Sequence, residues 1–586
     1  MKKSRYQFIF LLAITWAGCT TKTQVDNAAN SGKMFSDFEN IFLDAYWKHY
    51  PSASILIGYG KYYDNLVIPD SSAILNNISF SNQWLDSLNK MDYNYLSNND
   101  KISFKIIQNQ LESDSWYQSV FKQYEWDASI YNLSGECYYI INQPYALLDE
   151  RLKTLTKHLQ NAEVYFQSAF KILHQPTREH IELAILQNQG GLSVFGTTLT
   201  DSIKTSHLNE SEKIALNQNV LKAVGAIKNY INSLKNLLSD KKYVFRSFRI
   251  GKELFAKKFN YDLAVNLTPE ELYNKAIADK KNYYSKMYHL ADSLWFKYCK
   301  NQNKPTDTLT IIQSVIDKIS LQHSEPEHFF DTLTTQVYQL KKFIITKNLF
   351  DFDTIYPIKV RIMPAYARGV SVASADFSPP YQTNGETYYN IDDLTEYSKE
   401  KAASVLREYN NYSSQLLSIH EAIPGHCLQG IYNNKAHDKL RSVFTNGAMI
   451  EGWAVYVESM LLENGWGNYS PEIELMHDKL KLRELANVII DYDIQCLNKP
   501  KEYIMQLLVK ECFQTNAQAE EKYHRATVSQ VQLCSYYAGS SSIQSLRDEY
   551  EAKMGDAYSL KDFHEKFLTF GSAPIKFIRE LMLKKC

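Results

Sequence analysis

Residues 420–426 read HEAIPGH, and both the expected fold and the expected chemistry depend on this stretch. Zinc peptidases usually carry H-E-x-x-H, in which two histidines four positions apart share one helix face. Here His420 and His426 are six positions apart. A regular helix turns about 100° per residue, so it would leave these side chains about 120° apart. It could not direct both imidazoles at one metal ion.

Two residues inside the stretch predict that the helix is not regular. Pro424 lacks the N–H group that would continue the helical hydrogen bonds, and Gly425 tolerates the dihedral angles of a break. A break that loops out two residues would return His426 to about the place of an i+4 histidine, and such irregularities are frequent at functional sites. We therefore predict that His420 and His426 bind a metal, with Glu421 beside them as a general base.

A third ligand is expected, because catalytic zinc is bound by three protein side chains and keeps one position open. The sequence EGWAVYVE, residues 451–458, supplies Glu451 on a helix that follows the histidines. Glu458 lies on the same face of that helix. We predict Glu451 as the ligand, while Glu458 either holds a ligand histidine in place or is itself the third ligand.

The surrounding sequence predicts a mainly helical protein. The 586 residues include only 21 glycines and 15 prolines, and a long glycine-free stretch follows Gly251. Apolar residues recur at three- and four-residue steps over long segments, as amphipathic helices require. In LTPEEL, residues 267–272, Thr268 and Glu271 form the pattern of a capping box. That helix is expected to run to about Lys300.

The spacing of apolar residues changes between residues 355 and 391. Ile358, Val360 and Ile362 alternate with charged residues, and the short runs VSVASADF and TYYNI follow. Alternation of this kind predicts strands. We expect a small β-sheet within the helical protein, with an edge to which an extended peptide could add.

We expect one large helical domain over residues 35–586, with an N-terminal helical half at about 35–250 and a catalytic half at about 251–586. The formal net charge is −1, which argues against nucleic acid as a partner.

The N-terminus has the features of a targeting segment. Basic residues precede the apolar run FIFLLAITWAG, which is too short to span a bilayer and ends directly before Cys19. This resembles a bacterial lipoprotein signal. The resemblance implies a signal peptide at 1–18, a lipid anchor on Cys19, a flexible tether at 19–34, and export to the cell envelope.

The C-terminal half resembles a family of bacterial proteins known as domain of unknown function 885, whose members include metallopeptidase-like lipoproteins. The family pattern H-E-x-x-P-G-H-x-x-Q is matched by His420, Glu421, Pro424, Gly425, His426 and Gln429. Its E-G-W-A-x-Y-x-E is matched by Glu451, Gly452, Trp453, Ala454, Tyr456 and Glu458. Later motifs are matched by Gln532, Ser535, Tyr536, Gly539, Leu546, Arg547, Phe563, His564, Leu568, Gly571 and Pro574.

This resemblance implies a large helical zincin-like (gluzincin) fold, with a small sheet near the active-site cleft and a zinc ion as cofactor. It also suggests Tyr536, in the segment SYYAG, as the donor to the oxyanion that forms during hydrolysis. Tyr537 and His524 are the alternative candidates for this oxyanion donor. Arg547 or Arg525 could hold a substrate carboxylate.

The expected function is a zinc-dependent metallohydrolase, most readily a peptidase that cleaves oligopeptides with a glutamate general base. A lipid-anchored protein that binds nutrients or peptides is the alternative from another class. It gives no reason for His420, Glu421, His426 and Glu451 to occur together. A peptidase-like scaffold without activity is the third reading, and the intact Glu421 counts against it.

Overall fold

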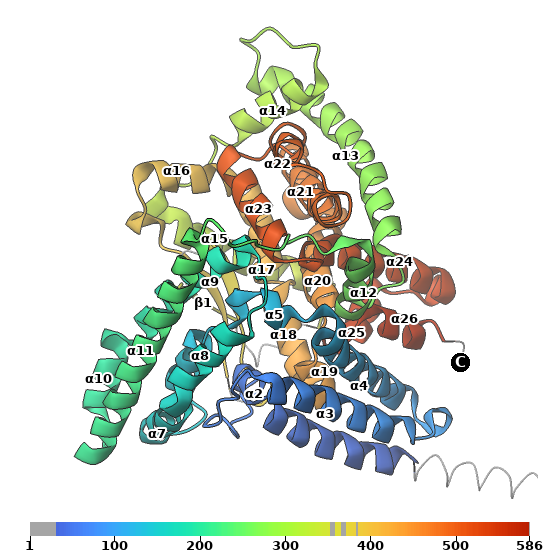
Figure 1. Ribbon diagram of the computed structural model, residues 1–586. Helices are drawn as coiled ribbons and strands as arrows, with labels where there is room; N and C mark the ends of the chain where they lie inside the picture. The colour runs from blue at the N-terminus through green and yellow to red at the C-terminus, as the bar shows by residue number, and fades with distance from the viewer. Residues whose placement is uncertain are drawn as a thin grey trace, which may run out of the picture.

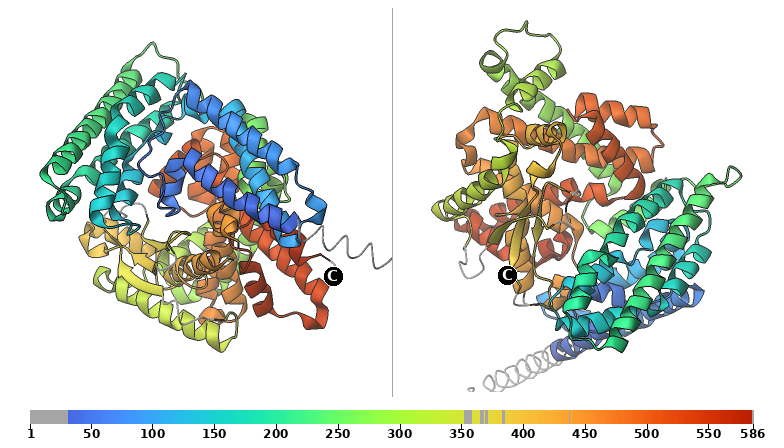
Figure 2. Two further views of the ribbon diagram at one scale, coloured as in Figure 1. Left: turned by 90° about the horizontal axis from the view of Figure 1, so that it is seen from below. Right: turned by 90° about the vertical axis from the view of Figure 1, so that its left-hand side faces the viewer.

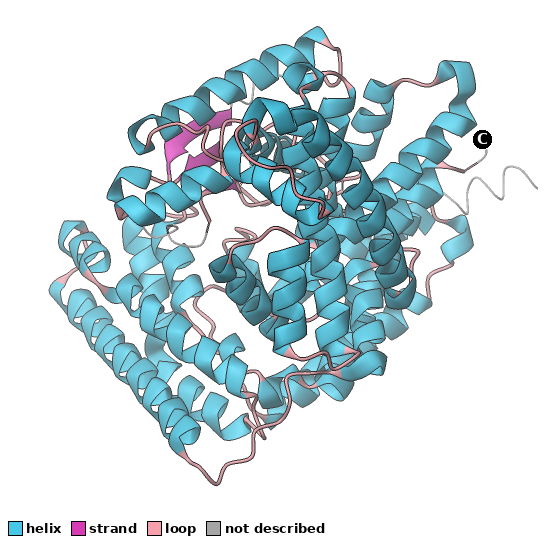
Figure 3. Ribbon diagram, turned by 90° about the horizontal axis from the view of Figure 1, so that it is seen from above, coloured by secondary structure: helices cyan, strands magenta, loops and turns pink. Residues whose placement is uncertain are grey.

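The computed structural model describes residues 31–351, 358–364, 368, 371–382, 385–436 and 438–584. Most of this chain is helical, with one small sheet (Figure 1 and Figure 3). The prediction of a mainly helical fold with a small sheet is therefore confirmed. The predicted signal peptide, Cys19 and most of the predicted tether lie outside the described residues.

The first part of the chain forms two groups of helices. Its helices are residues 31–49, α2 (Pro51–Leu56), α3 (Ser71–Asn89), α4 (Asn98–Trp116), α5 (Gln123–Trp126), α6 (Ser134–Asn142), α7 (Leu148–His158), α8 (Ala162–Ile172), α9 (Arg178–Gly191), α10 (Thr197–Thr205) and α11 (Glu210–Ser239). In one group α3 packs against α4, and in the other α11 packs against α7, α8 and α9. Figure 2 shows the second group as a bundle at one side of the molecule.

The remaining helices surround the sheet and the predicted site. They are α12 (Gly251–Leu263), α13 (Pro269–Tyr298), α14 (Thr308–Ile319), α15 (Phe329–Thr346), α16 (Lys399–Glu408), α17 (Ser413–Glu421), α18 (His426–Lys435), α19 (Lys439–Val443), α20 (Gly447–Glu463), α21 (Pro471–Gln495), α22 (Lys501–Gln506), α23 (Asn516–Val528), α24 (Ser535–Met554), α25 (Leu560–Leu568) and α26 (Ile575–Met582).

Helix α13 begins as the capping box predicts. The Thr268 hydroxyl accepts from the Glu271 N–H at 3.2 Å, and the Glu271 carboxylate accepts from the Thr268 N–H at 2.8 Å. The helix ends at Tyr298, two residues before the expected end. It packs along α21, and α21 in turn lines the predicted site.

The sheet has three strands in the order β1-β3-β2: β1 (Ile358–Ile362), β3 (Thr387–Ile391) and β2 (Ala373–Asp376). β1 and β3 are parallel, and β2 is antiparallel to β3. Helices α17 and α18, which carry the two predicted ligand histidines, pack against this sheet. The sheet therefore supports the site from one side.

Helix α20, which carries Glu451, runs through the interior. Trp453 on this helix is fully buried in a hydrophobic cluster that also includes Phe42 and Ile107 from the first part of the chain and Phe567 from α25. Segments far apart in the sequence thus fix the position of α20. Burial of this kind stabilises by about 25 cal/mol per Å² of apolar surface.

Helices α20 and α24 cross with their backbones in close contact, which two glycines permit. A Cβ atom at Gly452 would lie 2.4 Å from the Cα of Gly539, and one at Gly539 would lie 1.8 Å from the carbonyl oxygen of Ala448. Both glycines belong to the motifs quoted above. This crossing explains why glycine occupies both positions, and it sets Glu451 and Tyr536 on adjacent helices.

We predict that Gly539→Ala destabilises the protein by about 1–3 kcal/mol or more, because the added methyl group must push the two helices apart. Gly225→Ala is the matched control. Gly225 lies inside α11, and its added Cβ would meet no atom within 4 Å. That change should stabilise by about 0.5–1 kcal/mol. Urea unfolding of both variants measures the difference, and equal effects would contradict the close crossing.

Candidate metal centre

The chain breaks its helix between the two histidines. α17 ends at Glu421 and α18 begins at His426. Between them the N–H of Gly425 donates to the carbonyl of Ile419 at 3.0 Å. A Cβ atom at Gly425 would lie 1.9 Å from the carbonyl oxygen of His420, so only glycine fits this turn.

The break brings the two imidazoles together. The ring centroids of His420 and His426 are 4.8 Å apart, and the rings are almost perpendicular. Trp453 holds the break in place, because its indole N–H donates to the carbonyl of Pro424 at 2.9 Å. Helix α20 thereby fastens the turn between the histidines and also carries the third predicted ligand.

Glu451 completes the group. Its carboxylate oxygen lies 3.9 Å from Nε2 of His420 and 3.7 Å from Nε2 of His426. Within the described part of the chain, these three residues form the one group of three or more His, Cys, Asp or Glu side chains close enough to share an ion, with donor atoms within 4.8 Å of one another. Zinc bonds of about 2.0–2.2 Å place tetrahedral donors roughly 3.3 Å apart. Small side-chain movements would therefore suffice to bind zinc.

Glu458 lies behind His420 rather than among the three donors. Its carboxylate accepts from Nδ1 of His420 at 2.6 Å, and the residue is only 4% exposed. This hydrogen bond places the proton on Nδ1 and leaves Nε2 free to bind a metal. Of the two expectations for Glu458, the geometry favours the one in which it holds a ligand histidine.

The electrostatics of the group suit a cation. Burial lowers the pKa of His420, but the hydrogen bond and charge of Glu458, together with the charges of Glu421 and Glu451, outweigh burial and raise it to about 9. Burial raises the pKa of Glu451, yet His426, His420 and Arg525 hold it below its ordinary value. Several carboxylates thus face two imidazoles at a half-buried site. The donors and their charge fit a divalent zinc ion.

Glu421 and Tyr536 face the same cavity. This cavity has a volume of about 200 Å³, and its lining includes His420, Glu421, Glu458 and Tyr536. Arg525 donates to the Tyr536 hydroxyl at 3.2 Å. The structure therefore brings a carboxylate and a hydroxyl donor to the side of the cavity that His420 lines.

Three further candidates do not line this cavity. The Tyr537 hydroxyl donates to Asp279 and faces a different cavity, because neighbouring residues of a helix point about 100° apart. His524 is exposed on α23. Arg547 forms an ion pair with Glu463 at 2.8 Å. The geometry therefore does not support Tyr537 or His524 as an alternative oxyanion donor, nor Arg547 as the partner of a substrate carboxylate.

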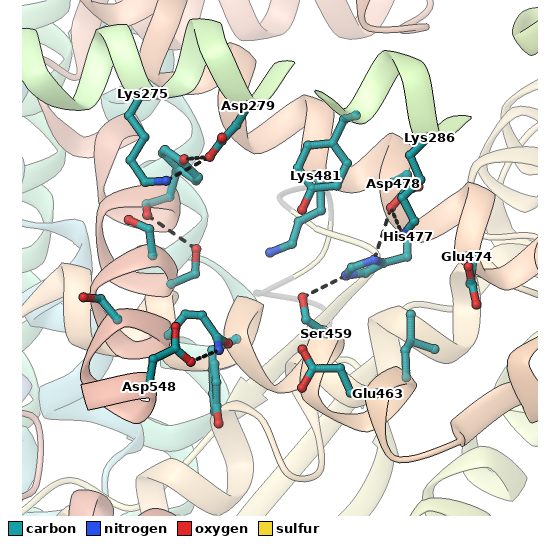
Figure 4. A pocket seen from close by; sticks show the side chains of 18 of the residues that line it. Lys275, Asp279, Lys286, Ser459, Glu463, Glu474, His477, Asp478, Lys481 and Asp548 are labelled. Carbon is teal, nitrogen blue, oxygen red and sulfur yellow. Dashed lines mark hydrogen bonds and ion pairs between the residues drawn. The ribbon is translucent and has the colours of Figure 1, made fainter. Parts of the chain in front are cut away.

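The other cavity is larger, at about 690 Å³, and is lined by different faces of α20 and α21 (Figure 4). It contains Ser459, whose hydroxyl lies 3.2 Å from Nε2 of His477. A serine-histidine-aspartate triad would need a hydrogen bond from His477 to Asp478. That distance is 3.8 Å, and Asp478 pairs instead with Lys286 at 3.0 Å. His477 and Asp478 therefore do not complete a triad with Ser459 in this cavity.

The structure also reveals cations that the sequence did not single out. Lys522 and Arg483 line the smaller cavity together with Arg525. In the sequence Lys522 stands in the charged run AEEKYHR, which is typical of a solvated helix face. Its burial depends on contacts with α21, which no local pattern predicts.

The comparisons with known proteins place the chain in a family. A solved structure of a candidate lipoprotein of unknown function from Shewanella oneidensis is 40% identical, covers 94% of this chain and 100% of its own, and has a TM-score of 0.86. A candidate lipoprotein from Colwellia psychrerythraea shares the fold, with 14% identity, a TM-score of 0.75, and coverage of 95% of this chain and 98% of its own.

A comparison with curated proteins finds no match. None of the described helices has the length and apolar character needed to cross a membrane. The family described as bacterial protein of unknown function (DUF885) matches residues 51–582. This match covers most of the chain, as the motifs around His420 and Glu451 lead one to expect, and the protein belongs to the DUF885 family.

Proposed function

We propose that this protein is a zinc-dependent hydrolase that cleaves oligopeptides. One observation carries the proposal: His420, His426 and Glu451 present their donor atoms within 4.8 Å of one another, and Glu421 lines the adjoining cavity. A binding protein would need no such group of ligands. A scaffold without activity would not need Glu421.

Each residue has a defined part in the proposed reaction. His420, His426 and Glu451 would hold the zinc ion, and Glu458 keeps His420 in the required tautomer. Zinc, when bound, supplies a Lewis acid that polarises a carbonyl and lowers the pKa of water towards neutrality.

Glu421 accepts a proton from the attacking water and returns it to the leaving amine nitrogen. The Tyr536 hydroxyl, which Arg525 contacts at 3.2 Å, donates to the carbonyl oxygen as it becomes negatively charged. Both groups come from rigid helix ends, α17 and α24, so the site needs little rearrangement.

The same proposal places the protein at the bacterial cell envelope, attached through a lipid on Cys19. The lipoprotein-like signal supports this location, and so do the descriptions of the two similar structures as candidate lipoproteins. Substrates would then be peptides outside the cytoplasm.

Removal of the metal tests the proposal. We expect the purified protein to contain about one zinc per chain, and we expect 1,10-phenanthroline to abolish cleavage of a mixed peptide library. Added zinc should restore cleavage, because the ligands are held in place by the fold. Mass spectrometry of the library measures the products. Cleavage that continues in metal-free protein would contradict the proposal.

A further inference from the structure

Three cationic side chains in the lining of the 200 Å³ cavity lie close enough to one another to interact electrostatically, and four glutamates, Glu408, Glu421, Glu458 and Glu484, share that lining. Lys522 and Arg525 reach it from α23, and Arg483 reaches it from α21. Lys522 and Arg525 are three positions apart, which places them on one face of their helix. His420 and Glu421 line the same cavity.

Lys522 is buried without a counter-ion. It is 7% exposed, and its ammonium group donates to the side-chain oxygen of Asn487 at 2.8 Å. No carboxylate among the described residues forms an ion pair with it. Burial lowers the pKa of Lys522 well below its ordinary value, and the charges of Arg483 and Arg525 lower it further, although the charge of Glu521 acts in the opposite direction. A buried cation of this kind is costly unless an anion joins it.

The two arginines differ in their partners. Arg483 forms an ion pair with Glu408 at 3.3 Å, and Glu408 also binds Lys479 at 2.9 Å. Arg525 forms no ion pair within the described part of the chain, and it donates to the side-chain oxygen of Gln532 at 2.7 Å and to the Tyr536 hydroxyl. Lys522 and Arg525 are therefore the two cations that can accept a new anion.

We propose that Lys522 and Arg525 bind the free C-terminal carboxylate of a peptide, so that the protein removes residues from the C-terminal end of its substrates. This inference rests on the proposed hydrolase function. The small size of the cavity favours the C-terminus of a peptide as the bound carboxylate over an acidic side chain within the peptide. Its volume of about 200 Å³ is below the roughly 300–1,000 Å³ of pockets that enclose drug-sized ligands.

The reaction balances with water as the only co-reactant. The water oxygen bonds to the peptide carbonyl carbon, and the C–N bond breaks. Glu421 transfers a water proton to the leaving nitrogen. The products are a shortened peptide with a new carboxylate and a released C-terminal fragment with a new amine, and this fragment carries the carboxylate bound by Lys522.

Three peptides with acetylated N-termini test the source of the carboxylate: one with a free C-terminal acid, its C-terminal amide, and an amide with an internal glutamate. We expect kcat/KM to be about 10–100-fold higher for the acid than for either amide, as a charged hydrogen bond would provide. Equal cleavage of the acid and the plain amide would overturn the inference. Preference for the internal glutamate would also overturn it.

Lys522→Met keeps most of the length of the unbranched side chain and removes its charge. It should lower kcat/KM for the acid about 10–100-fold and leave the amides almost unchanged, so that the preference disappears. Arg525→Met, at an exposed position, should also reduce the preference for the acid, and because Arg525 contacts Tyr536 its readout is the ratio of acid to amide cleavage rather than the amide rate. Lys510→Met is the control, because Lys510 is exposed and does not line the cavity. A preference that survives in both Lys522→Met and Arg525→Met would overturn the inference.

Binding separates this inference from the hydrolase proposal. Calorimetry with Glu421→Gln should show the acid binding about 10–100-fold more tightly than its amide, and Lys522→Met should remove that difference. Acid-selective binding without any hydrolysis by the wild-type protein would support the carboxylate site and refute the hydrolase. Zinc-dependent hydrolysis with equal binding of acid and amide would support the hydrolase and refute the carboxylate site.

Discussion

Glu421→Gln should lower kcat for peptide hydrolysis by about 10²–10⁴-fold while zinc remains at about one per chain. Glutamine has the same shape as glutamate but cannot accept the proton from the attacking water. Glu421 itself is not among the three donor residues, so metal binding should persist. Discontinuous assays of peptide hydrolysis measure kcat, and elemental analysis of the same preparation measures the zinc content.

Glu400→Gln is the matched control for this experiment. Glu400 is exposed in the first turn of α16 and does not line the cavity, so this variant should retain wild-type kcat. Loss of zinc in Glu421→Gln would mean that Glu421 is a ligand. Unchanged kcat would mean that another group acts as the base.

His426→Ala should lose both zinc and activity. With this imidazole removed, only His420 and Glu451 remain as donors, and two protein ligands are too few for a catalytic zinc site. We expect zinc content to fall well below one per chain, and turnover to fall to the level of protein treated with chelator. Elemental analysis and the peptide assay provide the measurement.

His426 is a cleaner target than His420 for this purpose. Removing His420 would leave Glu458, which is 4% exposed, as a buried carboxylate without its partner. That would destabilise the fold as well as the site. The control is His207→Ala, because the His207 side chain is 94% exposed and distant in sequence from the site. Full zinc content in His426→Ala would refute its role as a ligand.

The parts of the fold that depend on neighbouring residues could be predicted from the sequence. The start of α13 follows from Thr268 and Glu271, and the strand β1 follows from the alternation around Val360. The break at Pro424-Gly425 could also be predicted, because a proline without an N–H followed by glycine cannot continue a helix.

The parts of the fold that depend on contacts between distant segments could not be predicted from the sequence. Tyr536 and Tyr537 are adjacent and chemically alike, and only the direction of α24 decides which one faces the cavity with Glu421. Lys522 has the local sequence of an exposed residue, but packing of α23 against α21 buries it. The role of Gly539 depends on the crossing with α20, some ninety positions earlier in the chain.

Anomalous X-ray scattering at the zinc absorption edge, from crystals grown with zinc, tests the central claim most directly. The broken helix is claimed to let His420 and His426 share one cation with Glu451. We predict a single strong peak within about 2.0–2.2 Å of Nε2 of both histidines and of the Glu451 carboxylate. A peak bound elsewhere, or none between these three side chains, would contradict the account.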